Sequence, residues 1–106
     1  MKGELFTIQF TPLAYEDLDD IDHYITFTLL NSQAALSLLS DMEESIHQLS
    51  QFPFIGADLK DPYLKAKEYR KLIVRNYLIF YLVNQKKKTI IIMRIIYGAR
   101  NYQNLL

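Results

Sequence analysis

Arginine, lysine and tyrosine side chains gather in the second half of the chain, where they could act on a phosphate group. The set is Tyr69, Arg70, Lys71, Arg75, Tyr81, Arg94, Tyr97, Arg100 and Tyr102. Arginine contacts phosphate bidentately and aromatic rings stack on unpaired bases, so this composition suits a nucleic acid. Metal-free cleavage of RNA at its 2′-hydroxyl needs charge stabilisation, a proton acceptor and a proton donor. Arginine fills the first role, whereas tyrosine or lysine, with ordinary pKa values of about 10, would need strongly shifted pKa values for the others.

Other kinds of chemistry find little support in the residue types. The absence of cysteine excludes disulfides, thiolate catalysis and cysteine-ligated zinc. His23 and His47 have no second ligand at metal spacing, so we interpret both as helix-surface residues and expect no metal and no cofactor. The acidic run between residues 16 and 22 is interpreted as a solvated helix face, favourable near a helix N-terminus, rather than as paired catalytic carboxylates.

Charge is segregated along the chain although the net charge is zero. Residues 1–59 contain ten acidic residues and one base, whereas residues 60–106 contain eleven bases and two acids. One half could therefore present a positive field to a polyanion while the other half stays acidic. Attraction between a helix layer and a sheet layer is the alternative explanation. Arginines that only confer solubility are a further alternative, which fits Arg75 better than Arg94, because Arg94 lies among isoleucines.

Length and composition indicate one folded domain over residues 1–106. Half of the residues are hydrophobic, and the sequence has three glycines and three prolines, which argues against disorder. The N-terminus has no basic stretch followed by an apolar core, and no apolar run approaches about 18 residues. We therefore expect a cytoplasmic protein that does not contact a membrane.

The pattern along the chain predicts an α+β fold with element order β-α-α-β-β-β. Residues 4–10 alternate as a strand, and Thr11 and Pro12 suit the N-cap and first position of a helix. Apolar residues then recur at helical spacing from 14 to 29 and from 35 to 49, which predicts a helical hairpin. A loop should follow over residues 52–65, and then strands over 69–74, 77–83 and 89–97. The hairpin is expected to pack on a mainly antiparallel four-stranded sheet.

The last two predicted strands are apolar on both faces. If residues 84–88 form the whole connection, Val83 pairs with Thr89 and Leu78 lies opposite Arg94. Two helices cover only one face, so we expect the other to remain exposed and to bind a partner. The alternative is that the loop 52–68 or the C-terminal tail covers it. The predicted binding residues are Leu78, Phe80, Leu82, Ile92, Arg94, Ile96 and Arg100.

Three stretches resemble the RelE/ParE superfamily of bacterial type II toxins: LSQFPFIG, YRKLIVRNYLIFYLV and IIMRIIYGARNYQNLL. The superfamily pattern of leucine, three residues, proline, two residues and glycine is met by Leu49, Pro53 and Gly56. Its strand-exit glycine and arginine correspond to Gly98 and Arg100. The resemblance spans nearly the whole chain and is strongest over residues 49–106.

The resemblance implies a toxin that a cognate antitoxin neutralises by laying an extended or helical segment over it. RelE-like members cut mRNA in the ribosomal A site, whereas ParE-like members bind and poison DNA gyrase without being enzymes. The ending RIIYGAR is more similar to the ParE branch. We therefore expect binding to gyrase, with a ribosome-dependent mRNA endonuclease as the alternative. A third interpretation is a member that only partners an antitoxin and represses its own operon.

The resemblance also implies site residues for the nuclease alternative. Arg100 matches the arginine that stabilises the transition state, and Arg70 matches a base that contacts the RNA backbone. Leu72 and Leu78 stand where two further basic residues are expected. Tyr102 would have to replace a terminal tyrosine. Catalytic roles are thus assigned to Arg70, Arg100 and Tyr102 only if the protein is an enzyme.

Overall fold

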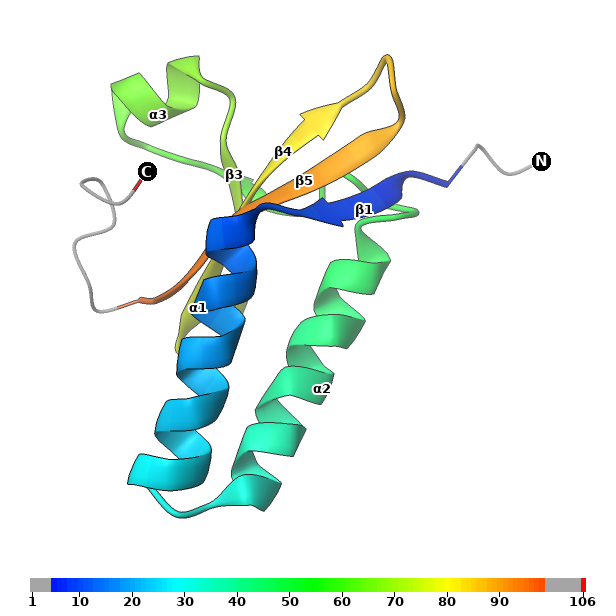
Figure 1. Cartoon of the computed structure of the whole chain (residues 1–106). Helices are drawn as coiled ribbons and strands as arrows, with labels where there is room; N and C mark the ends of the chain where they lie inside the picture. The colour runs from blue at the N-terminus through cyan, green and yellow to red at the C-terminus, as the bar shows by residue number, and fades with distance from the viewer. Residues whose placement is uncertain (1–4, 99–105) are drawn as a thin grey trace.

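The chain folds as helices packed on a twisted five-stranded sheet, shown in the computed structural model of Figure 1, which describes residues 5–98 and 106. The predicted α+β class and the helical hairpin on a mainly antiparallel sheet are confirmed. The sheet has five strands rather than the predicted four, because β2 pairs with β3 as an additional edge strand. The sheet order is β1-β5-β4-β3-β2, and β1 pairs in parallel with β5. The elements are β1 (Thr7–Phe10), α1 (Pro12–His23), the π-helical turn η1 (Tyr24–Thr28), α2 (Ser32–Gln48), β2 (Ala57–Asp58), α3 (Pro62–Ala66), β3 (Arg70–Val74), β4 (Tyr77–Asn84) and β5 (Thr89–Tyr97).

Short side-chain hydrogen bonds set where the two long helices begin. The Thr11 hydroxyl accepts from the Ala14 amide at 3.1 Å and donates to the Met93 carbonyl of β5 at 2.9 Å. Thr11 therefore caps α1 and also fixes its start against the sheet. Asn31 caps α2 in the same way, through a 3.0 Å bond from the Ala34 amide.

The main core lies between the helical hairpin and one face of the sheet. From the helices it takes the predicted stripe, including Ala14, Leu38, Met42 and Ile46, each no more than 6% exposed. From the sheet it takes Val74, Ile79, Tyr81, Ile90, Ile92 and Ile95. Burial of these side chains supplies the main driving force for folding.

The predicted register between β4 and β5 is wrong. Thr89 pairs with Asn84 rather than with Val83, so the connection is four residues long. A shift follows between Phe80 and Tyr81, after which Phe80 pairs with Arg94. Because a slip of one residue moves a strand's side chains to the other face, Ile90 and Ile92 join the helix-facing core instead of lying beside Leu78.

The expectation that one face of the sheet stays exposed is also wrong. The segment after α2, predicted as a plain loop, contains β2 and α3 and folds over that face. Its buried residues Leu59, Leu64 and Tyr69 form a second core with Leu78, Phe80 and Ile96 of the sheet, and Leu106 packs against this core. The alternative in which the chain covers its own second face is therefore the correct one.

Most of the predicted binding residues are consequently buried. Leu78, Phe80, Ile92 and Ile96 are 9%, 0%, 0% and 2% exposed, and only Leu82 is half-buried among the predicted aliphatic and aromatic residues. They do not form an exposed apolar patch. The four buried residues stabilise the fold.

Candidate functional site

Arg70, predicted to contact RNA, is bound to the chain's own loop. Its guanidinium donates to Asp58 Oδ1 at 2.8 Å and to the carbonyls of Phe54 and Gly56 at 3.0 Å and 2.7 Å. It also lies over the Phe54 ring, with its central carbon 5.2 Å from the ring centroid. These contacts occupy the planar group that would clamp a phosphate and fix the loop before β2.

Tyr81, another of the basic and aromatic candidates, is fully buried beside the same loop. Its hydroxyl donates to the Pro53 carbonyl and accepts from the Gly56 amide, both at 2.9 Å. Burial raises the pKa of Tyr81 above its ordinary value, against smaller opposing effects of the Gly56 hydrogen bond and of Arg70. A neutral phenol with both of its hydrogen-bonding roles filled holds the loop in place and is poorly suited to proton transfer.

Arg94 makes a two-pronged ion pair with α1. Its Nε and Nη2 donate to the two carboxylate oxygens of Asp17 at 2.8 Å and 2.9 Å, and the side chains are 16% and 12% exposed. The amide of Ile95 donates to the same carboxylate at 2.9 Å. Asp17 thereby accepts a hydrogen bond from the edge of β5 at a position beyond the last residue of β1. The hydrogen bonds to Asp17 raise the pKa of Arg94 above its ordinary value. Asp17 is thus not part of a solvated acidic face, contrary to expectation.

Arg75 also finds its partners within the chain. It lies in the turn between β3 and β4 with φ at 55°, and its guanidinium donates to Asp41 and to Ser37 of α2, both at 2.9 Å. Arg100 and Tyr102, the other two predicted catalytic residues, lie outside the described residues. Arg70, Arg75 and Arg94 pair with Asp58, Asp41 and Asp17, so each described arginine is held by a different carboxylate.

Neither a metal site nor a membrane span is found within residues 5–98. This part of the chain contains no cluster of three or more histidine, cysteine, aspartate or glutamate side chains that could hold a metal ion. Its helices are too short or too polar to cross a membrane.

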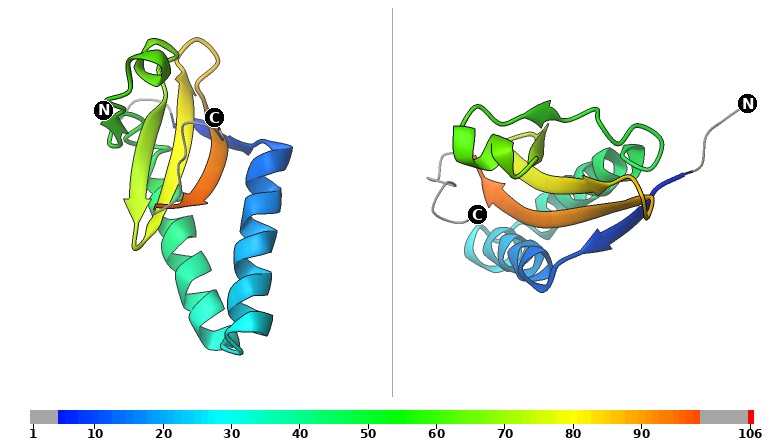
Figure 2. Two further views of the ribbon diagram at one scale, coloured as in Figure 1. Left: turned by 90° about the vertical axis from the view of Figure 1, so that its left-hand side faces the viewer. Right: turned by 90° about the horizontal axis from the view of Figure 1, so that it is seen from above.

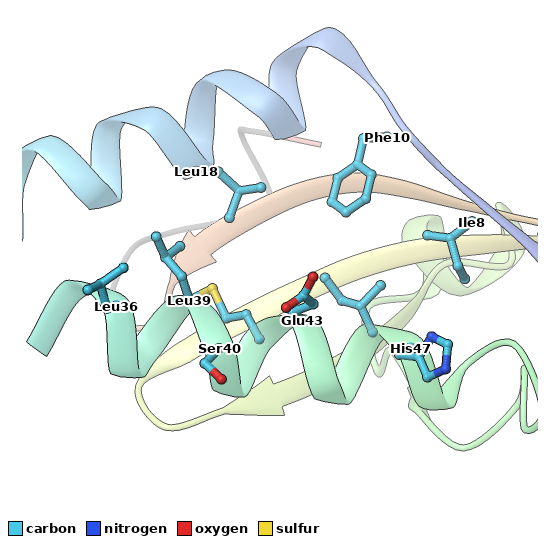
Figure 3. A pocket seen from close by; sticks show the side chains of 10 residues that line it. Ile8, Phe10, Leu18, Leu36, Leu39, Ser40, Glu43 and His47 are labelled. Carbon is cyan, nitrogen blue, oxygen red and sulfur yellow. The ribbon is translucent and has the colours of Figure 1, made fainter. Parts of the chain in front are cut away.

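The helical hairpin, in contrast, leaves an apolar groove between α1 and α2 (Figure 3). The groove has a volume of about 570 Å³, with Ser40, Glu43 and His47 of α2 in its lining. Ile8 and Phe10 of β1 and Leu18 of α1 point across it towards α2. Its other lining residues are Leu36, Leu39, Met42 and Ile46.

A second hollow lies on the other side of α1. It has a volume of about 630 Å³ and includes Tyr77 and Tyr97 at the strand ends, and Asp20, Tyr24 and Leu29 on the α1–η1 side. Neither hollow was predicted, because the apolar stripes of both helices were expected to be filled by the core. Apolar residues outside those stripes, such as Leu36, were the available signal.

Comparison with known proteins identifies the family to which the chain belongs. Residues 8–102 match the family model of the ParE toxin of the type II toxin–antitoxin system parDE. The chain belongs to the ParE toxin family. The predicted RelE/ParE resemblance is confirmed, and the protein is a ParE-type toxin of a type II toxin–antitoxin system.

Two solved structures share the fold of this ParE-family toxin. The chromosomal ParDE toxin–antitoxin system from P. aeruginosa is similar over 90% of this chain and 98% of that chain, with 27% identity and a TM-score of 0.68. The toxin–antitoxin complex RelBE2 from Mycobacterium tuberculosis is similar over 93% of this chain and 98% of that chain, with 18% identity and a TM-score of 0.60. Among curated protein sequences, none matches this chain significantly.

The structure gives a physical reason for the leucine–proline–glycine pattern in this ParE-family toxin. Leu49 is fully buried in the main core, and Pro53 and Gly56 supply the carbonyl and the amide that hold the Tyr81 hydroxyl. A Cβ atom at Gly56 would lie 2.6 Å from both the Tyr81 hydroxyl and the Lys71 carbonyl. Glycine at residue 56 is therefore required by close approach of the backbone.

Proposed function

We propose that this ParE-family toxin inhibits growth by binding DNA gyrase rather than by cutting RNA. The observation that carries the proposal is the engagement of Arg70 and Tyr81 with the loop 53–58. RNA cleavage needs a free cation for the phosphate and titratable groups for proton transfer, and these two side chains are committed to the fold. Leucine stands at residues 72 and 78, where the nucleases are expected to carry bases. The resemblance to the ParE branch implies gyrase as the target.

The proposal includes a cognate antitoxin that occupies the groove between α1 and α2. The P. aeruginosa neighbour is described as a ParDE toxin–antitoxin system, which supports an antitoxin partner. The groove lining is mostly aliphatic, and residues 5–59 contain no lysine or arginine. An amphipathic segment with apolar residues and a basic rather than an acidic border fits this chemistry. Burying a few hundred Å² of apolar surface, at about 25 cal/mol per Å², favours association by several kcal/mol before entropic costs.

The test measures gyrase activity and RNA cleavage side by side. Purified toxin should block supercoiling of relaxed plasmid by gyrase with ATP and should trap linear plasmid DNA. An equimolar amount of the cognate antitoxin should restore supercoiling. Primer extension on mRNA from cells that express the toxin should show no codon-phased cuts.

The opposite pattern would replace the proposal with the nuclease alternative. That pattern is unaffected supercoiling together with codon-phased cuts that disappear in the Arg100→Ala variant. Antitoxin binding without either effect would favour the third interpretation, a protein that only partners its antitoxin and represses its operon.

A further inference from the structure

The end of the helical hairpin carries exposed apolar side chains that the proposed antitoxin groove does not include. Tyr24, Phe27, Leu29 and Leu30, here called the hairpin-tip patch, are 54%, 66%, 55% and 83% exposed. None of these four residues lines the groove between α1 and α2. The tip extends beyond the sheet, at the opposite end from α3 and the β4–β5 connection (Figures 1 and 2). A cluster of this kind on a soluble fold marks an interaction site.

The backbone at the tip is also unusual. The hairpin turns through η1, where the Leu29 amide donates to the Tyr24 carbonyl at 3.0 Å, and the Asn31 amide donates to the Ile25 carbonyl at 3.0 Å. This last bond spans six residues and closes the wide turn at the end of η1, and the residue before Asn31 has a positive φ. That residue is Leu30, with φ at 53°. Glycine or asparagine is favoured there, so neither backbone preference nor burial explains a leucine that is 83% exposed, whereas contact with a partner would.

Charge around the tip restricts what the partner can be. Asp19, Asp20 and Asp22 lie on the last turns of α1, and no lysine or arginine occurs between residues 5 and 59. The Arg75 side chain reaches α2 from the sheet, but its charge is paired with Asp41. Such a surface repels DNA, RNA and the same surface of a second copy of the chain. It attracts a protein whose apolar recess is bordered by lysine or arginine.

The tip has a shape that suits a recess of this kind. Phe27 and Leu30 project from the turn, while Tyr24 and Leu29 continue into the hollow that Asp20, Tyr77 and Tyr97 also line. The exposed apolar tip is therefore continuous with a neighbouring apolar hollow, whose lining includes the acidic side chain of Asp20. Aromatic and aliphatic anchors surrounded by complementary charge are the usual centre of a protein interface.

We propose that the hairpin-tip patch is the surface by which this toxin engages its protein target, at an apolar recess bordered by basic side chains. The inference rests on the proposed function, in which toxicity arises from binding. It assigns target and antitoxin to different surfaces: the target to the tip, and the antitoxin to the groove between α1 and α2.

The test uses a double variant of the full chain, Phe27→Ser with Leu30→Asn, and a control, Leu13→Ser. Leu13 is 51% exposed on the first turn of α1, away from the tip. The double variant should need at least about tenfold more protein to inhibit gyrase supercoiling, whereas its affinity for the cognate antitoxin should stay within about twofold of wild type. The control should leave both values unchanged. Leu30→Asn alone should unfold at the same or a higher temperature than wild type, because asparagine tolerates the left-handed backbone.

Three results would overturn the inference. The double variant could inhibit as strongly as wild type, or it could lose antitoxin binding along with inhibition. In the third result, the wild-type protein binds duplex DNA in a fluorescence anisotropy measurement and the double variant does not. If wild-type toxin leaves gyrase unaffected, the gyrase proposal fails on its own, and growth inhibition in cells becomes the readout for the tip. Loss of growth inhibition with antitoxin binding retained would then support the tip surface, and retained growth inhibition would refute it.

Discussion

The sheet half and the helical hairpin of this toxin differ in whether their charged and apolar side chains find partners within the chain. In the sheet half, Arg70, Arg75 and Arg94 each pair with an aspartate of the same chain, and the second face is covered by Leu59, Leu64 and Tyr69. The helical hairpin leaves an apolar groove, an apolar hollow and an apolar tip. Paired charges and filled cores stabilise a fold, whereas unfilled apolar surface favours association. Arg70, Arg75 and Arg94, which the sequence presented as functional candidates, therefore stabilise the fold through ion pairs.

Breaking the ion pair that joins the two halves should have the largest effect on stability. Asp17→Ala removes the two carboxylate oxygens to which Arg94 Nε and Nη2 donate, and with them the acceptor of the Ile95 amide. We expect it to lower the free energy of unfolding by about 3 kcal/mol, because a largely buried cation loses its counter-charge. Urea denaturation of the purified toxin measures this loss. Asp19→Ala on the same helix is the control and should change stability by less than about 0.5 kcal/mol. Equal effects at the two aspartates would show that the ion pair does not hold α1 to β5.

Removing one hydroxyl within the sheet half should have the next largest effect. Tyr81→Phe leaves the Pro53 carbonyl and the Gly56 amide without their partner. We expect a loss of about 2 kcal/mol in the free energy of unfolding, the usual cost of buried unpaired groups. Tyr97→Phe, at a residue that is 46% exposed, is the matched control. A Tyr81→Phe variant as stable as wild type would mean that this hydroxyl does not secure the loop.

Matched substitutions on the two halves should separate binding from folding. Leu36 in the groove and Ile73 on β3 are 69% and 66% exposed. Leu36→Ser should weaken binding of the cognate antitoxin about tenfold, whereas Ile73→Thr should not change it. Both variants should keep their free energy of unfolding within about 0.5 kcal/mol of wild type. Isothermal titration calorimetry measures the affinities, and weaker binding by Ile73→Thr alone would place the antitoxin on the sheet half instead.

The smallest expected effect is a loss of stability at alkaline pH. Burial raises the pKa of Tyr81 and of Tyr77 in the folded protein. The folded state therefore keeps these protons when the unfolded state has lost them, and this stability is fully present below the unfolded pKa of about 10. It is lost as the pH rises from there through the folded pKa values. Thermal unfolding between pH 9 and pH 11.5 should show the midpoint falling, with a shallower fall in Tyr81→Phe than in wild type. Parallel curves for the two proteins would contradict the assignment.

The predictable part of this structure is local. The capping roles of Thr11 and Pro12 and the apolar stripes of α1 and α2 follow from spacing within one helix, and they predicted the hairpin correctly. The family pattern around Gly56 likewise lies within eight residues of sequence. Such signals need no knowledge of how distant segments meet.

The parts that sequence reasoning missed depend on distant contacts. Asp17 and Arg94 are 77 residues apart, and nothing in the acidic run of α1 marks Asp17 as the member that turns inward. Leu59, Leu64 and Tyr69 lie in a segment rich in polar residues and turn formers, which conceals that they cover the sheet. The register shift between Phe80 and Tyr81 changes which isoleucines lie on the same face of the sheet. The residue types around it do not predict such a shift.

Methyl NMR of the toxin with and without its cognate antitoxin tests most directly whether the antitoxin binds to the helical hairpin rather than to the sheet. Binding should shift or broaden the methyl signals of the groove residues Ile8, Leu18, Leu36 and Leu39. The signals of Leu59, Leu64, Leu78 and Ile96 in the second core should stay unchanged. Large shifts in that second core, with the groove signals unaffected, would contradict the account and return the antitoxin to the face of the sheet that this chain covers by itself.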